Sequence, residues 1–334
     1  MADVSTTVLP WTQPGWLQAA SGWIETQLAA QGLALAGPID QPHVRPWSTV
    51  LRVPTRTGLL YFKASAPVLS HEAALTMALA RWRPDCMPEV LAADTARSWL
   101  LMRDSGTPLR ALIKADGHLR QWHTVLPLFA EVQMALVGQR DELQQLGALD
   151  RRLAVLPAEY ERLLADMDSL LIDKPDGLSS EAYQRLRALA PRFAADCQRL
   201  ADFGLPETLH HDDFHDNNIF IRDGRVTFTD WGESCVAHPF FTTVVMLRNA
   251  AYTSGLPANA PEVVALRDRY LQPWERLAPR ATLLEACALA QRVGMVCRTL
   301  TWHRVVTNLA EPYRSENADA VPGWLGEFLE LMTL

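Results

Sequence analysis

The chain has 334 residues, of which 49% are hydrophobic and 21% are charged, and this balance is that of a globular protein rather than a disordered or fibrous one. The net charge of −7, with a pI near 5.7, argues against broad nucleic-acid binding. No apolar run reaches membrane-spanning length and the first ten residues lack a secretion-signal pattern, so we expect a cytoplasmic protein that binds neither nucleic acid nor membrane.

The first hundred residues predict a small antiparallel sheet preceded by one helix and interrupted by another. Apolar residues recur at helical spacing over residues 14–31, and Gly32 follows as a stop signal. Runs of β-branched and aromatic residues broken by Pro or Gly predict the strands. The expected strands are residues 33–44, 48–53, 59–64, 90–93 and 98–102, with a helix at 70–82.

Beyond Arg103 the pattern changes to long helices with one short interruption rich in strands. We expect helices at 119–146, 153–172 and 181–203, strands within 208–231, and helices again from 239 to 334, with breaks near Ala258 and Pro312. The pattern predicts an α+β fold with two lobes, 1–102 and 103–334. The five cysteines contain no C-x-x-C pair, and we expect buried small hydrophobes rather than disulfides or zinc ligands.

The segment from Leu209 to Gly232, LHHDDFHDNNIFIRDGRVTFTDWG, carries the clearest chemical pattern. Asp223-Gly224 is a two-residue turn flanked by alternating apolar residues, which predicts a tight hairpin. Such a hairpin brings Asn218 and Asp230 to the same end, where their oxygens suit Mg²⁺. Asp213 precedes the hairpin, and there it can accept the proton of a hydroxyl group during phosphoryl transfer.

Lys63 and Glu72 are expected to form an ion pair. Lys63 lies on a strand that otherwise looks buried, and Glu72 shares a helix face with apolar residues. An unpaired buried charge costs several kcal/mol, so each charge is explained by the other. The pair would orient Lys63 toward nucleotide phosphates, and the alternative is an ion pair with a structural role alone.

With these residues in place, the sequence resembles the aminoglycoside phosphotransferase and choline kinase superfamily, a branch of the protein-kinase-like fold. The resemblance covers most of the chain and implies a two-lobed fold with a small antiparallel-sheet N-lobe and a mostly helical C-lobe. It also implies ATP and Mg²⁺ as cofactors and a small-molecule hydroxyl acceptor. DWG, at residues 230–232, stands where protein kinases carry DFG.

The resemblance also implies roles for individual residues. Lys63 and Glu72 correspond to the phosphate-binding lysine and its helix partner, Asp213 to the catalytic aspartate, and Asn218 and Asp230 to the metal ligands. His211 takes the place of the histidine that braces the catalytic loop. The interlobe hinge, whose backbone would bind adenine, corresponds to Leu101, Met102 and Arg103. The turn at the nucleotide loop lacks glycine here, and its expected phosphate contacts are Arg45 and Ser48.

Two other classes of protein remain as alternatives. Four histidines with neighbouring aspartates, His210, His211, His215 and His238, are compatible with a metallohydrolase. A catalytically silent nucleotide-binding module on the same fold is the second alternative. Asp230 is followed within ten residues by a helical run, which leaves no room for a peptide-binding activation segment. We therefore expect a small acceptor, with Asp216, Glu233, Trp302, His303, Glu311 and Tyr313 as candidate contacts.

Overall fold

The computed structural model describes residues 8–332 and divides into two compact units. Unit 1 comprises the chain up to Thr107 together with Phe220–Gly232 and Asn308–Ser315; unit 2 comprises Pro108–Ile219, Glu233–Thr307 and Glu316–Leu334. The border lies slightly later than the predicted one, and two distant segments join the N-terminal unit. Residues 1–7, which carry most of the segment considered for a secretion signal, lie outside the described residues.

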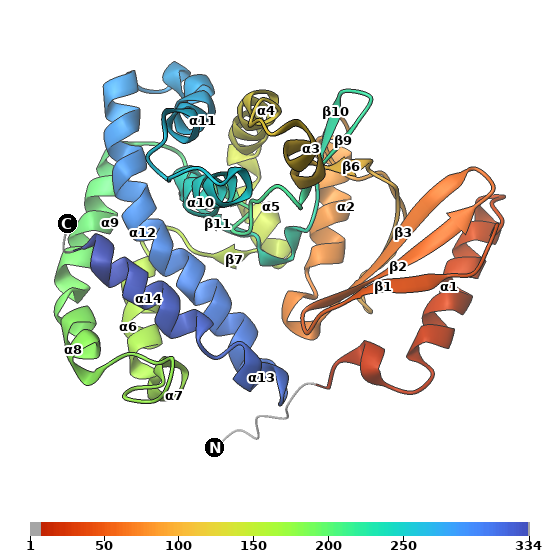
Figure 1. Ribbon diagram of the computed structural model, residues 1–334, viewed down its shortest axis with the longest axis horizontal. Helices are drawn as coiled ribbons and strands as arrows, with labels where there is room; N and C mark the ends of the chain where they lie inside the picture. Colours follow the sequence, from red (N-terminus) through yellow and green to blue (C-terminus); the bar gives the residue numbers. More distant parts are fainter. Residues whose placement is uncertain (1–7, 333–334) are drawn as a thin grey trace. The chain divides into compact units, whose positions relative to one another are not determined.

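A five-stranded antiparallel sheet forms the framework of unit 1 (Figure 1). Its order is β1-β2-β3-β5-β4, and α2 (Glu72–Trp82) connects β3 to β4. The first strand is shorter than predicted because Gly37 and Pro38 interrupt the run before it, which leaves one isolated bridge from Leu35 to Thr55. The strands are β1 (Asp40–Val44), β2 (Ser48–Thr55), β3 (Gly58–Ser65), β4 (Val90–Asp94) and β5 (Trp99–Arg103).

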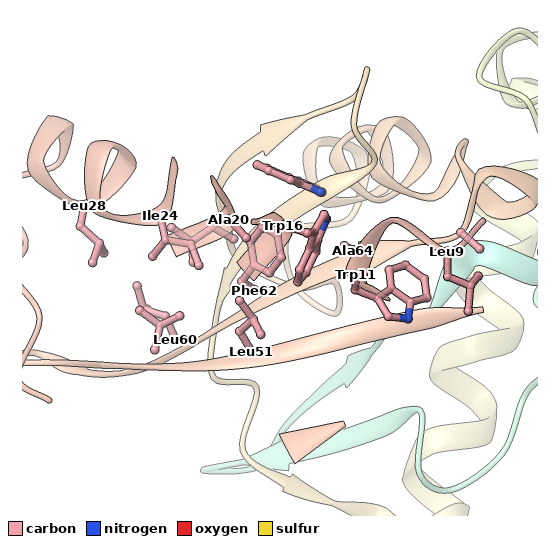
Figure 2. Packing of buried hydrophobic residues seen from close by; sticks show 14 residues of the cluster. Leu9, Trp11, Trp16, Ala20, Ile24, Leu28, Leu51, Leu60, Phe62 and Ala64 are labelled. Carbon is pink, nitrogen blue, oxygen red and sulfur yellow. The ribbon is translucent and has the colours of Figure 1, made fainter. Parts of the chain in front are cut away.

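Helix α1 (Trp16–Ala30) covers one face of this sheet through an aromatic core (Figure 2). Trp16 lies 6.2 Å from Phe62, and Phe62 lies 5.4 Å from Trp99, measured between ring centroids. Leu60, Phe62 and Ala64 of β3 all belong to this core. Because side chains alternate along a strand, the intervening Lys63 faces the opposite side of the sheet.

The predicted hairpin is confirmed. Strands β9 (Ile219–Arg222) and β10 (Arg225–Phe228) are neighbours, with β6 (Thr107–Pro108) beside β9. Asp223 and Gly224 have φ values of 50° and 81°, as a type I′ turn requires. The Phe228 amide donates to the Cys86 carbonyl at 2.9 Å, which fastens the hairpin to the loop after α2.

Unit 2 is built mainly from helices, with one small three-stranded sheet. Strand β11 (Cys235–Ala237) pairs with β7 (Leu149–Asp150) in parallel and with β8 (Thr208–His210) antiparallel. The larger helices are α3 (Leu109–Asp116), α4 (Trp122–Ala135), α6 (Leu156–Ala165), α8 (Ser180–Ala188), α9 (Ala190–Asp202), α10 (Thr242–Ser254), α11 (Pro261–Leu271), α12 (Arg280–Thr307) and α14 (Ala320–Leu331); the shorter ones are α5 (Arg140–Gln145), α7 (Met167–Leu170) and α13 (Tyr313–Glu316), the last at the unit border.

Three long helices predicted in this region are each broken in two. A 3₁₀ turn containing Gly138 separates α4 from α5, because glycine weakens a helix interior. Asp166 ends α6 in a non-helical conformation, and Pro191 opens α9 after α8 ends. The α+β class is confirmed by these two units. Within residues 8–332, no helix has both the length and the apolar character needed to cross a bilayer.

Candidate functional site

Lys63 in unit 1 is shared by two carboxylates. Its Nζ donates to Glu72 Oε1 at 2.6 Å and to Asp230 Oδ1 at 2.7 Å. Glu72 lies on the first turn of α2, and its second oxygen accepts a hydrogen bond from the Ser65 hydroxyl on β3. The Lys63 and Glu72 side chains are almost fully buried, whereas 43% of the Asp230 side chain is exposed. The expected ion pair is therefore present, and Asp230 joins it.

The pKa values of Lys63 and Glu72 depend on their burial and on the two carboxylates that share the Lys63 ammonium. Burial favours the neutral amine of Lys63, but Asp230 and Glu72 outweigh it and raise the lysine pKa above its ordinary value. Burial raises the pKa of Glu72, and the attraction of Lys63 only partly opposes this. One ammonium thus stabilises two carboxylates incompletely. Asp230 is the exposed member of the group, so its carboxylate is the one that a cation can approach from solvent.

The two residues predicted for the nucleotide loop differ in their exposure to solvent. Arg45 is exposed in the turn between β1 and β2, where its amide donates to the Ser48 carbonyl at 2.9 Å. Ser48 is only 4% exposed. Arg45 is thus accessible to a phosphate, whereas the burial of Ser48 argues against the contact predicted for its side chain.

The predicted adenine-binding segment lies inside strand β5 and is not an open hinge. Leu101 and Met102 pair with β3 on one side and with β4 on the other. The Arg103 amide donates to the Glu89 carbonyl at 3.0 Å. These backbone groups are already used by the sheet, so the structure does not favour adenine binding at 101–103.

In unit 2, Asp213 lies in the loop after β8, where Arg298 from α12 and the loop residues His215 and Asn218 contact it. Arg298 Nη2 donates to Asp213 Oδ1 at 2.9 Å, and His215 Nε2 lies 3.2 Å from Oδ2. Asn218 Nδ2 donates to the Asp213 carbonyl at 3.0 Å, so the oxygen of the same amide points away from Asp213. About a quarter of the Asp213 side chain is exposed. The carboxylate is therefore held in place yet accessible.

Arg298, on α12, is the functional candidate that sequence analysis missed. It also donates to Glu233 and, at 3.2 Å, to the Asp212 carbonyl. Burial opposes ionisation of Asp213, but Arg298 outweighs it with help from His215, and the Asp213 pKa lies well below its ordinary value. Arg298 is the one charged residue in the run GMVCRTLTW, and this was the available signal.

The pKa of Glu233 is shifted in the opposite direction from that of Asp213. Burial raises its pKa to about 7, because the attraction of Arg298 is offset by repulsion from Asp213 and Asp212. Asp213 and Glu233 thus compete for one guanidinium. The result is an ionised Asp213 at neutral pH beside a carboxyl group that titrates near neutrality.

Side chains of the Asp213 loop are held by contacts with neighbouring residues. Asp216, fully buried, accepts from Arg110 Nε at 2.7 Å, so it has a structural role and is not the acceptor contact expected from sequence. Asp212 adopts φ 61°, a conformation that aspartate tolerates better than most residues. His211 is buried, with its ring 5.7 Å from that of Phe214, which is compatible with the predicted bracing role.

The other predicted acceptor contacts are mostly engaged elsewhere. The Arg298 guanidinium lies 5.4 Å from the Trp302 ring centre and 5.9 Å from that of Trp324, so these rings already face a cation of the protein itself. His303 lies 2.7 Å from Asp166, and Glu311 accepts from the Ser315 hydroxyl at 2.6 Å. Tyr313 packs against the core of unit 1.

The histidines do not form the oxygen-rich centre of a metallohydrolase. His210 and His215 contact Asp212 and Asp213, respectively, and His238 is fully buried with its pKa lowered to about 3 by burial and by His210. Asn218 and Asp230 instead offer amide and carboxylate oxygens, the hard ligands that Mg²⁺ prefers.

Comparison with known proteins places the chain among phosphotransferases. Residues 47–280 match the model of the phosphotransferase enzyme family. The chain belongs to this family. No curated protein matches the sequence significantly. The match extends from the turn before β2 to the start of α12, and it includes Lys63, Asp213, Asn218 and Asp230.

Several solved structures share the fold at low sequence identity. A choline/ethanolamine kinase family protein from Mesorhizobium loti has a TM-score of 0.61 and 17% identity, covering 94% of this chain and 95% of its own. Choline kinase from Cryptosporidium parvum has a TM-score of 0.60 and 10% identity, covering 95% of each chain. An aminoglycoside phosphotransferase in complex with AMP-PNP and hygromycin B has a TM-score of 0.53 and 14% identity, covering 92% and 98%. The predicted protein-kinase-like fold is confirmed.

Proposed function

We propose that the protein transfers the γ-phosphoryl group of ATP to a hydroxyl group of a small molecule, with Mg²⁺ as the metal. The observation that carries the proposal is the pair of charged groups around Lys63 and Asp213, in a chain that belongs to the phosphotransferase family. Two of the similar structures are named for choline or ethanolamine kinases and one was solved with AMP-PNP, which supports a nucleotide and a hydroxyl acceptor.

Each residue has a role that follows from its contacts. Lys63, fixed by Glu72, supplies a positive charge for phosphate oxygens. Asp230 and Asn218 each offer an oxygen ligand to Mg²⁺. ATP would supply the phosphoryl group, and Mg²⁺ would neutralise its charge. Arg45 is an accessible additional cation.

Asp213 receives the proton of the acceptor hydroxyl. As the bond from the acceptor oxygen to phosphorus forms, the bond between the β- and γ-phosphates breaks, the proton passes to Asp213 Oδ, and ADP leaves. Burial opposes the ionisation of Asp213, but Arg298 outweighs it and lowers the Asp213 pKa. Asp213 is therefore ionised throughout the neutral range and can accept a hydrogen bond from the acceptor hydroxyl. A weak base suffices, because a loose transition state places little charge on the attacking oxygen.

The proposal is tested by ADP release against a panel of amino alcohols, aminoglycosides, macrolides, sugars and amino sugars. Asp230→Asn is the informative variant, because asparagine tolerates the φ of 65° at this position but removes the charged ligand. We expect it to abolish the Mg²⁺-dependent thermal stabilisation by ATP. Asp223→Asn, in the exposed turn of the same hairpin, is the matched control.

Three outcomes are informative. Turnover of one acceptor class by the wild type and by Asp223→Asn, but not by Asp230→Asn, supports the proposal. ATP stabilisation without turnover on any acceptor supports the silent nucleotide-binding module instead. An unchanged Mg²⁺-dependent ATP shift in Asp230→Asn contradicts the role of Asp230 as a metal ligand.

A further inference from the structure

Three buried side chains with soft donor atoms converge behind the Asp213 loop in unit 2. His210 on β8 lies directly opposite Cys235 on β11 in their antiparallel pairing, so the two side chains share one face of the small sheet. Cys297 reaches them from α12. The potential ligand atoms of these three residues all lie within 4.8 Å of one another, and each residue is at most 1% exposed.

The distances are close to those of a metal site. Zinc bonds of about 2.0–2.1 Å to nitrogen and about 2.3 Å to sulfur separate tetrahedral ligands by about 3.3–3.8 Å. The three side chains therefore need to approach one another by only about an ångström around an ion. Among the described residues 8–332, this is the one group of three His, Cys, Asp or Glu side chains close enough to share an ion.

The surroundings of His210 match those of a ligating histidine. Its Nε2 lies 3.0 Å from Asp212 Oδ1, and its Nδ1 lies 3.1 Å from the Thr242 hydroxyl. Whichever nitrogen binds a metal, the other keeps a polar partner that fixes the ring, as is usual for metal-bound histidine. Asp212 is 2% exposed and lies outside the group of ligand atoms that are all within 4.8 Å of one another. Its carboxylate would become a fourth ligand by turning from His210 Nε2 toward the ion, and otherwise it orients the imidazole.

The charge balance also favours an ion. Two thiolates, one neutral imidazole and one divalent cation carry no net charge, and the negative charge that the Asp212 carboxylate would add faces the Arg298 guanidinium, whose Nη1 lies 3.9 Å from Asp212 Oδ2. Such a set avoids the desolvation cost of an isolated buried charge.

We propose that His210, Cys235 and Cys297 form a buried structural site for zinc, with Asp212 completing its coordination. Binding releases the two thiol protons to solvent and leaves no oxidation state changed. The donors are sulfur and nitrogen, so this site is chemically distinct from the oxygen ligands proposed for Mg²⁺. If the cysteines were only packing residues, as expected from sequence, the contact would be an ordinary pair of buried thiols.

The site would stabilise the Asp213 loop from behind. Cys297 directly precedes Arg298, which donates to Asp213 and to the Asp212 carbonyl. An ion that joins α12 to β8 and β11 would fix the position of that guanidinium. Residues 210, 235 and 297 would thus act on Asp213 by positioning Arg298, without touching substrate.

The first test is the metal content of the intact protein, purified from zinc-containing medium and dialysed without chelator. We expect one zinc per chain, and after exchange, Co²⁺ should give the thiolate charge-transfer absorption and the intense visible bands of tetrahedral coordination. This measurement uses the wild-type chain, so it does not depend on the folding of a variant. Absence of bound zinc and of the cobalt spectrum overturns the proposal.

The second test compares two substitutions on the same helix. Cys297→Ala removes a proposed ligand, whereas Cys287→Ala removes an equally buried thiol of α12 that lies outside the group. We expect at least a 100-fold loss of zinc affinity in chelator competition for Cys297→Ala and no change for Cys287→Ala. Equal loss in both variants, or a disulfide between Cys235 and Cys297 in the purified protein, contradicts the site.

Discussion

Replacement of Lys63 by methionine should destabilise the protein in a strongly pH-dependent manner. The methionine keeps most of the apolar stem but leaves Glu72, 1% exposed, without its cation. Its remaining partner is the Ser65 hydroxyl, which can stabilise a carboxylate only in part. Glu72 can avoid carrying a buried charge by binding a proton, and this sets an upper limit on the destabilisation.

The limit follows from the ordinary glutamate pKa of 4.5. Keeping Glu72 protonated costs about 1.4 kcal/mol for each pH unit above that value, which is about 3.4 kcal/mol at pH 7 but only about 0.7 kcal/mol at pH 5. The sign is that of a raised carboxyl pKa. The folded state binds the proton more tightly than the unfolded chain, so stability is retained below pH 4.5 and lost as the pH rises.

Urea unfolding at pH 5, 6 and 7 measures this effect. Lys63→Met should lose up to about 3.4 kcal/mol relative to wild type at pH 7 and much less at pH 5. Lys63→Met/Glu72→Gln should recover most of the loss at pH 7 and show no such pH dependence. Lys174→Met, at an exposed lysine, is the control. A deficit of equal size at pH 5 and pH 7, or a double variant as unstable as the single one, would refute the reasoning.

Three further predictions concern the Asp213 group. Asp213→Asn should lower kcat by about 10²- to 10⁴-fold with ATP affinity nearly unchanged, measured on the acceptor found in the panel; full turnover would exclude Asp213 as the base. Arg298→Met should cost about 3–5 kcal/mol in urea unfolding because it leaves two carboxylates without their cation, with Arg298→Lys losing less and Arg292→Met on the same helix as control. Glu233→Gln removes a carboxyl whose pKa burial raises to about 7, so it should flatten the fall in stability between about pH 4.5 and 7; an unchanged profile of the urea midpoint would show that Glu233 does not titrate there.

Several features could be predicted because they depend on neighbours in the sequence. The two-residue turn at Asp223-Gly224 demands positive φ values, which Asp and Gly tolerate, and this decides the hairpin by itself. Lys63 and Glu72 are separated by one short connection between a strand and a helix. Each charge stood out against an apolar background, so their pairing followed from the cost of burying either alone.

The sequence predicted helix ends and the hydrogen-bond partners of backbone groups less accurately. Periodicity continued across Gly138 and Asp166, so single long helices were expected, although the local conformation breaks them. Leu101 to Arg103 resembled a hinge in sequence. Only the pairing of β5 on both sides showed that their backbone groups are occupied.

The sequence by itself determined the α+β class, the hairpin at Asp223-Gly224 and the pairing of Lys63 with Glu72, because strand alternation, turn chemistry and helix periodicity are local properties. Only the tertiary structure decided which charges share a partner. Arg298 is 85 residues from Asp213 in the chain, and Cys297 is still farther from His210. Contacts over such separations depend on how α12 packs against the small sheet of unit 2, and no local pattern encodes that packing.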